Sequence, residues 1–171
     1  ASDGQWRFPA SDSVPYKFKK CIVYYEDEHF YHHFGFNPAA MYKAFQQNRS
    51  AGKVVRGGST LTQQVIRLSR HNKKRTYFEK VIEMILATRL EFRHSKEKIL
   101  ELYLNKISFG SNSYGVEQAS RRFFGKPAKD INILEASIIA SLPKTPTGYN
   151  PYSRRDRLMG YIYHHDTKGT E

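Results

Sequence analysis

Apolar residues at helical spacing are the feature that most constrains the fold of this chain. Between residues 76 and 93 they recur every three or four positions, which predicts a helix with one apolar side. That side consists of Val81, Ile82, Ile85, Leu86 and Leu90. Similar spacing predicts helices that begin at Pro38, at Ser59 as the N-cap, near Ser95, near residue 114 and near residue 131. No pair of strands is convincing, so the sequence predicts a mainly α-helical domain.

The segments outside these helices are less regular. Residues 1–20 contain Pro9 and Pro15 and are predicted to be an extended lead-in. The short apolar run Cys21–Tyr25 is compatible with a strand or with the first turn of a helix. Three glycines within Asn48–Gly58 predict a mobile loop there.

Length and composition exclude several classes of protein. A chain of 171 residues is long enough for one domain with its own core. A single cysteine, Cys21, excludes a disulfide framework and a metal site built from several cysteines. No apolar run is long enough for a transmembrane helix, and the first residues lack the pattern of a signal peptide.

Positive charge is concentrated in one third of the chain. The formal net charge is +12, and the segment from Lys43 to Lys98 holds 14 basic and four acidic residues, a net charge of +10. Clustering of this kind favours an anionic partner such as a nucleic acid, phospholipid head groups or a phosphorylated substrate. No nucleic-acid-binding motif is present, so we expect no nucleic-acid partner.

Three consecutive acids, Glu26, Asp27 and Glu28, follow the apolar run. They are compatible with a solvated turn. Alternatively, Glu26 lies at the edge of the core, where a carboxylate can act as the general base for a sugar hydroxyl. Nearby histidines lack the spacing of a zinc site, so His33 is predicted to be a hydrogen-bonded structural residue.

Residues 56–64 carry the most specific local pattern, Arg-Gly-Gly-Ser-Thr-Leu-Thr-Gln-Gln. Its glycines allow close backbone approach, and its hydroxyl residues stand at the start of a predicted helix, a position that favours phosphate or oxyanion binding. Lys80 and Glu83 follow at i, i+3 spacing, either as a surface ion pair or as part of a diphosphate site together with Arg67 and Arg75.

Five ordered motifs resemble glycosyltransferase family 51, the peptidoglycan glycosyltransferases found alone or in class A penicillin-binding proteins. They begin at Glu26, Gly57, Lys80, Lys98 and Leu134, and together they extend over residues 21–151. In letters they are EDxxFxxHxG, GGSTLTQQ, KxxE, KILELYLN and LEA, the last closing on Pro143 and Tyr149–Pro151. The segments Asp3–Pro9 and 55–62 further resemble the 1C type of penicillin-binding protein.

The resemblance implies a lysozyme-like helical domain with a mobile, membrane-facing jaw over residues 36–56. It also implies that lipid II is polymerised into β-1,4 glycan strands, with Glu26 as the base and undecaprenyl diphosphate leaving with inversion. Glu83 matches the second family glutamate, near the diphosphate. No cofactor is required, although Mg²⁺ or Mn²⁺ can bind at Glu83 in such a site.

The resemblance assigns further residues by position. Those expected to hold diphosphate and sugar are Ser59, Thr60, Gln63, Gln64, Arg67, Arg75 and Lys80. Those expected to be structural parts of the motifs are Asp27, Phe30, His33, Gly57, Gly58 and Asn105. The implied organisation is a lead-in over 1–20, the catalytic domain over 21–151 and a C-terminal remnant over 152–171.

The implied partners are lipid II, the growing glycan strand, the membrane surface and other cell-wall synthesis proteins. The implied location is the outer, periplasmic face of the bacterial cytoplasmic membrane, with an anchoring helix absent from this sequence. Glu79 departs from the family pattern, which has arginine there. This departure keeps open a second function, a catalytically weak module that binds lipid II or glycan. A lysozyme-like hydrolase is a third alternative.

Overall fold

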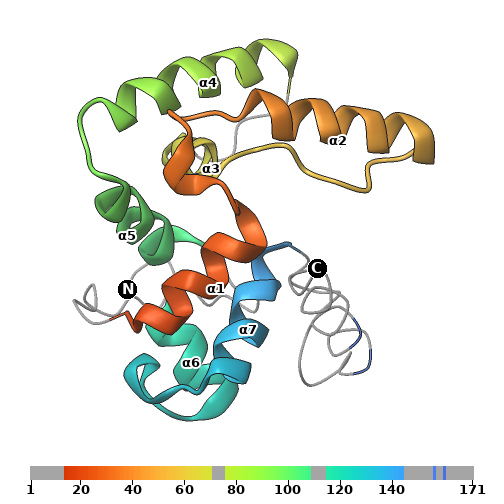
Figure 1. The fold of residues 1–171 in the computed structure, drawn as a ribbon. Helices are drawn as coiled ribbons and strands as arrows, with labels where there is room; N and C mark the ends of the chain where they lie inside the picture. Colours follow the sequence, from red (N-terminus) through yellow and green to blue (C-terminus); the bar gives the residue numbers. More distant parts are fainter. Residues whose placement is uncertain (1–13, 71–75, 109–114, 145–155, 157–159, 161–171) are drawn as a thin grey trace. The chain divides into compact units, whose positions relative to one another are not determined.

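The computed structural model describes residues 14–70, 76–108, 115–144, 156 and 160, and this part of the chain is helical without strands (Figure 1). The predicted mainly α-helical class is therefore confirmed. The α-helices are α1 (Tyr16–Glu26), α2 (Pro38–Ala51), α3 (Leu61–Ser69), α4 (Tyr77–Glu91), α5 (Lys96–Lys106), α6 (Val116–Phe124) and α7 (Ile133–Ser141). Short 3₁₀ turns are η1 (Phe30–His32), η2 (Ala128–Asp130) and η3 (Leu142–Lys144).

The described residues form two compact units. One contains Glu26–Tyr103, and the other combines Ala1–Tyr25 with Leu104–Glu171. In the second of these units, α6 packs against α7 and η2. Cys21 of α1 reaches α7, where its Sγ lies 3.6 Å from Ser137 Oγ. Phe18 and Ile22 place the apolar side of α1 fully in the core, a burial that stabilises the helix.

Two sequence predictions about segment boundaries are wrong. Tyr16–Lys20 are helical rather than extended, because Pro15 provides the carbonyl that begins α1 and accepts from the N–H of Phe18 at 2.9 Å. Asn48–Ala51 belong to α2, whereas the predicted loop was to start at Asn48. The helix ends only at Gly52, which has φ of 63°.

The Glu26–Tyr103 unit is held together by α3 packing on α4. Capping residues fix where its helices begin. Asn37 accepts from the N–H of Ala40 at 3.0 Å, and Thr76 accepts from the N–H of Glu79 at 3.1 Å. The helix predicted over 76–93 is thus present as α4, with Thr76 as its N-cap.

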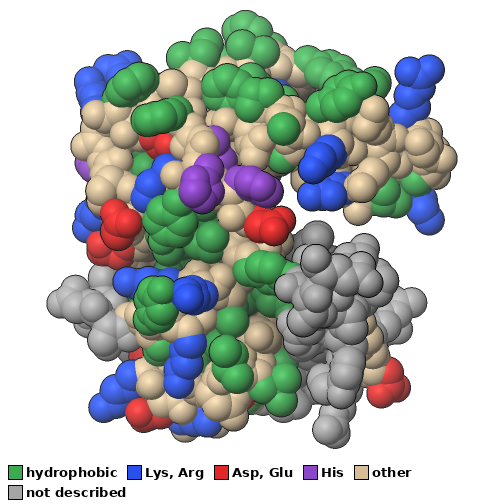
Figure 2. Space-filling model, viewed as in Figure 1, with side chains coloured by type: hydrophobic (Ala, Val, Ile, Leu, Met, Phe, Trp, Pro, Cys, Tyr) green, Lys and Arg blue, Asp and Glu red, His purple; other side chains and the backbone are tan. Residues whose placement is uncertain are grey.

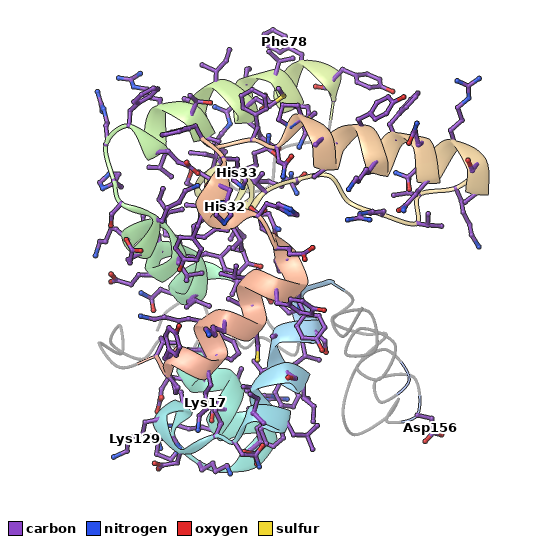
Figure 3. The ribbon with its side chains drawn as sticks, in the orientation of Figure 1. Lys17, His32, His33, Phe78, Lys129 and Asp156 are labelled. Atoms are coloured by element: carbon purple, nitrogen blue, oxygen red, sulfur yellow. The ribbon has the colours of Figure 1, made fainter. Side chains whose placement is uncertain are left out.

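The apolar side predicted for α4 is only partly buried. Glu83 and Ala87 are its buried residues, whereas Val81 is 52% exposed and Ile85 is 62% exposed. Phe78 lies on the same outer side and points away from the helix (Figure 3). Part of the apolar side of α4 therefore faces solvent, while Ile82, Leu86 and Leu90 are half-buried. The helix packs on α3 through the side that carries Lys80 and Glu83.

Gly35 allows the turn after η1 to approach α4. Its φ is +82°, and a Cβ there would lie 2.5 Å from the backbone nitrogen of Thr88. Real Cβ atoms essentially never come so close, so no other residue fits without displacing α4.

We expect Gly35→Ala to lower the free energy of unfolding by about 3 kcal/mol, from left-handed backbone strain plus overpacking. Gly52→Ala is the matched control, since Gly52 has φ of +63° but nothing within 4 Å of a Cβ, and it should cost only about 1 kcal/mol. Urea unfolding of both variants measures the difference. Equal losses would show that the approach to α4 is not tight.

Candidate active site

Glu26 is the last residue of α1 and is half-buried. Its Oε2 accepts a hydrogen bond from Gln64 Nε2 at 2.9 Å. Gln64 lies one turn into α3, so a carboxylate at the end of one helix is held by an amide from another. Two residues that the sequence assigned to base and substrate roles are therefore in direct contact.

Tyr103 extends this contact and was missed as a site residue. Its hydroxyl lies 3.4 Å from Gln64 Oε1, on the other end of the amide that donates to Glu26. Burial raises the pKa of Tyr103 well above its usual value, and the negative charge of Glu26 raises it further. The apolar residues around Tyr103 in α5 indicate a core residue, so only the structure reveals its polar contact.

Asp27 follows Glu26 and turns inward. Its Oδ2 accepts from His33 Nε2 at 2.9 Å and from the backbone N–H of Leu61 at 2.9 Å. The hydrogen bond predicted for His33 is thus present, and it connects the turn after η1 to Asp27. Because Leu61 is the first residue of α3, Asp27 also connects the end of α1 to the start of α3.

Thr60, rather than Ser59, is the N-cap of α3. The Thr60 hydroxyl accepts from the N–H of Gln63 at 3.2 Å, and Gln63 Oε1 accepts from the N–H of Thr60 at 3.1 Å. The same hydroxyl donates to the carbonyl of Gly35 at 2.6 Å. The predicted cap was wrong by one residue because the Ser59 hydroxyl is bonded to cationic side chains.

Ser59 Oγ accepts hydrogen bonds from two cationic side chains. Lys80 Nζ donates to it at 2.8 Å, and Arg67 Nη2 donates to it at 3.2 Å. Lys80 also donates to Gln63 Oε1 at 3.1 Å. Four residues predicted to hold diphosphate and sugar therefore form one cluster, built from α3, the segment just before it and α4.

Glu83 orients the arginine of this cluster. Its two oxygens accept from Arg67 Nε at 2.8 Å and from Arg67 Nη2 at 2.9 Å, a two-pronged ion pair between α4 and α3. The hydrogen bond and charge of Glu83 raise the pKa of Arg67, although burial acts in the opposite direction. Lys80 Nζ lies 3.8 Å from Glu83 Oε2, so the predicted Lys80–Glu83 pair is also formed.

Glu79, the departure from the family pattern, has its own cation. Its Oε2 accepts from Arg70 Nη2 at 2.8 Å, at the C-terminal end of α3. Arg70 thus offsets the charge of Glu79 locally. Arg70 could not be identified from the sequence, because only the packing of α3 on α4 brings residues 70 and 79 together.

The remaining predicted residues differ in how they are placed. Phe30 is fully buried, and a Cβ at Gly58 would lie 2.9 Å from Met41 Cα, so this glycine lets the chain approach α2. Gly57 has no such neighbour. Asn105 is half-buried in α5, in the unit that does not contain Glu26. Arg75 lies outside the described residues.

Metal-binding side chains do not gather in the described part of the chain. There, no group of three or more His, Cys, Asp or Glu residues could hold a metal ion. The divalent cation at Glu83 stays a prediction, and any such ion would share that carboxylate with Arg67.

Taken together, these contacts place a carboxylate and a cationic cluster in one unit of the structure, both attached to α3. The carboxylate of Glu26 can accept a proton. The cluster of Ser59, Arg67 and Lys80 supplies hydroxyl, guanidinium and ammonium donors suited to an anionic group. Such a pair is suited to a displacement in which a hydroxyl is activated and an anion leaves.

Comparison with known proteins agrees with this chemistry. The family model described as Transglycosylase matches residues 2–161. The chain is 42% identical to penicillin-binding protein 1A of Aquifex aeolicus over 156 residues, which are 91% of this chain and 22% of that protein. It is 43% identical to penicillin-binding protein 2D of Bacillus subtilis over 133 residues, 78% of this chain and 19% of that protein.

Penicillin-binding protein 1F of Bacillus subtilis is 35% identical over 164 residues, 91% of this chain and 23% of that protein. The chain thus spans about a fifth of the length of these relatives. The 1C type stays a prediction, since these relatives carry the names 1A, 1F and 2D. Because the family model covers most of the sequence and the relatives match it at this identity, the chain belongs to the transglycosylase family.

Proposed function

We propose that the chain is a peptidoglycan glycosyltransferase that polymerises lipid II into β-1,4 glycan strands. The observation that carries the proposal is that α3 contacts both a carboxylate and a cationic cluster. Its Gln64 donates a hydrogen bond to Glu26, and its Arg67 donates one to Ser59. A single displacement requires these two parts, a base for the acceptor and a stabilised leaving group.

Each part has a defined role in the proposed reaction. Glu26 accepts the proton of the acceptor's 4-hydroxyl, and the oxygen attacks the anomeric carbon of the growing chain. The bond to undecaprenyl diphosphate breaks on the opposite face, so the configuration inverts. Lys80, Arg67 and Ser59 stabilise the negative charge that develops on the diphosphate.

Glu83 serves this reaction through Arg67. With both oxygens on the guanidinium, it fixes the plane of Arg67 and neutralises part of its charge. Arg67 therefore acts mainly as an oriented hydrogen-bond donor, while Lys80 supplies the larger share of net positive charge. Because Arg70 offsets Glu79, no described contact favours the catalytically weak binding module over the enzyme.

The membrane surface is the second proposed partner. Large apolar side chains are exposed on α2, on the segment after it and on α4: Tyr42, Phe45, Val54, Val55, Phe78, Val81 and Ile85. Figure 2 shows hydrophobic side chains gathered over α4, with basic side chains along α2. An apolar surface with basic neighbours fits a bilayer with anionic lipids. It includes the predicted jaw and extends beyond it to α4.

The proposed location is the outer face of the bacterial cytoplasmic membrane, where lipid-linked substrate is used. Other cell-wall synthesis proteins stay predicted partners. In the described residues, no helix has the length and apolar character needed to span a bilayer.

Glu26→Gln should lower polymerisation of labelled lipid II by about 10²-fold or more, because the amide keeps the shape but accepts no proton. Binding of lipid II should change little. The length of the product is measured on gels, and digestion by muramidase is the control that identifies it as glycan. Glu28→Gln, at an exposed acid two residues later, should leave the rate unchanged. Near-normal polymerisation by Glu26→Gln would refute the assignment of the base.

Lys80→Ala should lower kcat more than it raises KM, since its ammonium acts most strongly on the leaving diphosphate. Loss of a charge-assisted contact of roughly 1.5–3 kcal/mol predicts a rate lower by about tenfold to a hundredfold. Steady-state kinetics with lipid II measure both constants. Lys106→Ala removes the same charge from an exposed residue and should have no effect. A change in KM alone would assign Lys80 to ground-state binding.

Replacing Val81 and Ile85 by serine should weaken binding to vesicles of phosphatidylcholine with 30% phosphatidylglycerol by at least about tenfold, since two half-exposed side chains lose apolar burial. Co-sedimentation measures the binding. The double variant Ile133→Ser/Leu134→Ser is matched, because both residues are exposed on α7. Equal losses in the two variants would argue against a membrane contact specific to α4.

A further inference from the structure

A buried ionic cluster lies in the same unit of the structure as the proposed base. Glu91, the last residue of α4, has a side chain that is only 2% exposed, and Lys96, the first residue of α5, has one that is 18% exposed. Lys96 Nζ lies 2.8 Å from the Glu91 carboxylate. The motifs that define the site do not include either residue.

The cluster binds the turn that follows η1. Lys96 Nζ donates to the carbonyl of His33 at 2.6 Å and lies 4.6 Å from the centre of the Phe30 ring. On the other side of the imidazole, His33 Nδ1 lies 4.0 Å from Glu91 Oε1. His33 (labelled in Figure 3) is therefore held through its backbone by Lys96 and faces Glu91 through its ring.

The cluster also binds the start of α3. The hydroxyl of Thr62, which is fully buried, donates to Glu91 Oε1. Glu91 thus faces two segments at once: His33 in the turn after η1 and Thr62 in the first turn of α3. Asp27 joins the same two segments, because it accepts from both His33 and Leu61.

We propose that Glu91 and Lys96 are positioning residues for the glycosyl transfer: they fix His33 and the first turn of α3, and thereby the placement of Glu26 relative to Gln64. The inference rests on the proposed function of Glu26. Neither residue touches the reacting atoms. They act through Asp27, which is adjacent to Glu26 in the chain, and through α3, which carries Gln64 and Arg67.

A buried pair of this kind is sensitive to loss of one partner. Removing the Lys96 ammonium leaves the Glu91 carboxylate in the interior with fewer donors, and the carboxylate then draws solvent or moves. Either response shifts the turn that carries His33. Since displacements near 1 Å in an active site cost about 10²-fold in rate, a positioning defect should appear in kcat.

The test compares Lys96→Met with Lys106→Met in the full chain, using labelled lipid II. Lys106 is the last residue of the same helix, is exposed and lies outside the motifs. We expect Lys96→Met to lower kcat by about tenfold to a hundredfold with KM changed less than threefold, and Lys106→Met to match the wild type. A folded Lys96→Met protein with wild-type kcat overturns the proposal.

Two milder substitutions at Thr62 test the proposal even if Lys96→Met does not fold. Thr62→Val removes only the hydroxyl that reaches Glu91, and Thr62→Ser retains it. The valine variant should lose about fivefold to tenfold in kcat, as expected for one hydrogen bond to a charged group, and the serine variant should recover most of the rate. Equal rates for valine, serine and the wild type overturn the proposal.

Double variants that also carry Glu26→Gln distinguish an effect on the placement of Glu26 from a general loss of activity. If the cluster acts by placing Glu26, then Lys96→Met or Thr62→Val should add less than twofold to the defect of Glu26→Gln. Multiplying defects overturn the proposal, because they show an effect independent of the base. Full activity of Glu26→Gln alone overturns the proposed function instead, whatever Lys96 does.

Discussion

The carboxylate of Asp27 accepts two hydrogen bonds, and the architecture of the site depends on them. One comes from the His33 ring and the other from the first N–H of α3, a group that no intrahelical carbonyl can satisfy. A negative charge at this helix end is favourable on electrostatic grounds as well. Since Glu26 precedes Asp27 directly, the contact sets where the proposed base lies relative to α3.

Helix α3 contacts both the proposed base and the groups proposed to stabilise the leaving diphosphate. Its first turn contains Gln63 and Gln64, which diverge toward Lys80 and Glu26 respectively. One turn later Arg67 bonds to Glu83 on α4. A short helix with fixed caps is a rigid support, so the base and the leaving-group donors keep a constant separation without relying on loops.

Much of this arrangement could be predicted from the sequence, and the failures have physical causes. The apolar spacing of residues 76–93 predicted α4, but periodicity reports amphipathicity and not which medium faces each side, so the exposure of Val81 and Ile85 could not be predicted. Ser59 and Thr60 are both good caps, and only the side chains of Lys80 and Arg67 determine which hydroxyl is available. Charged residues such as Glu91 and Lys96 are usually exposed, so their burial required the tertiary structure.

The continuity of the Glu26–Tyr103 unit has a consequence for synthesis of the chain. Every contact described around Glu26 joins residues between 26 and 103. The other unit needs both ends of the sequence. During translation, the partners of Glu26 described above are therefore available once residue 103 has left the ribosome, while Cys21 of α1 still awaits Ser137 of α7. Until the later segment of that unit emerges, Phe18 and Ile22 on α1 lack part of the unit that buries them, and exposed apolar side chains of this kind favour aggregation.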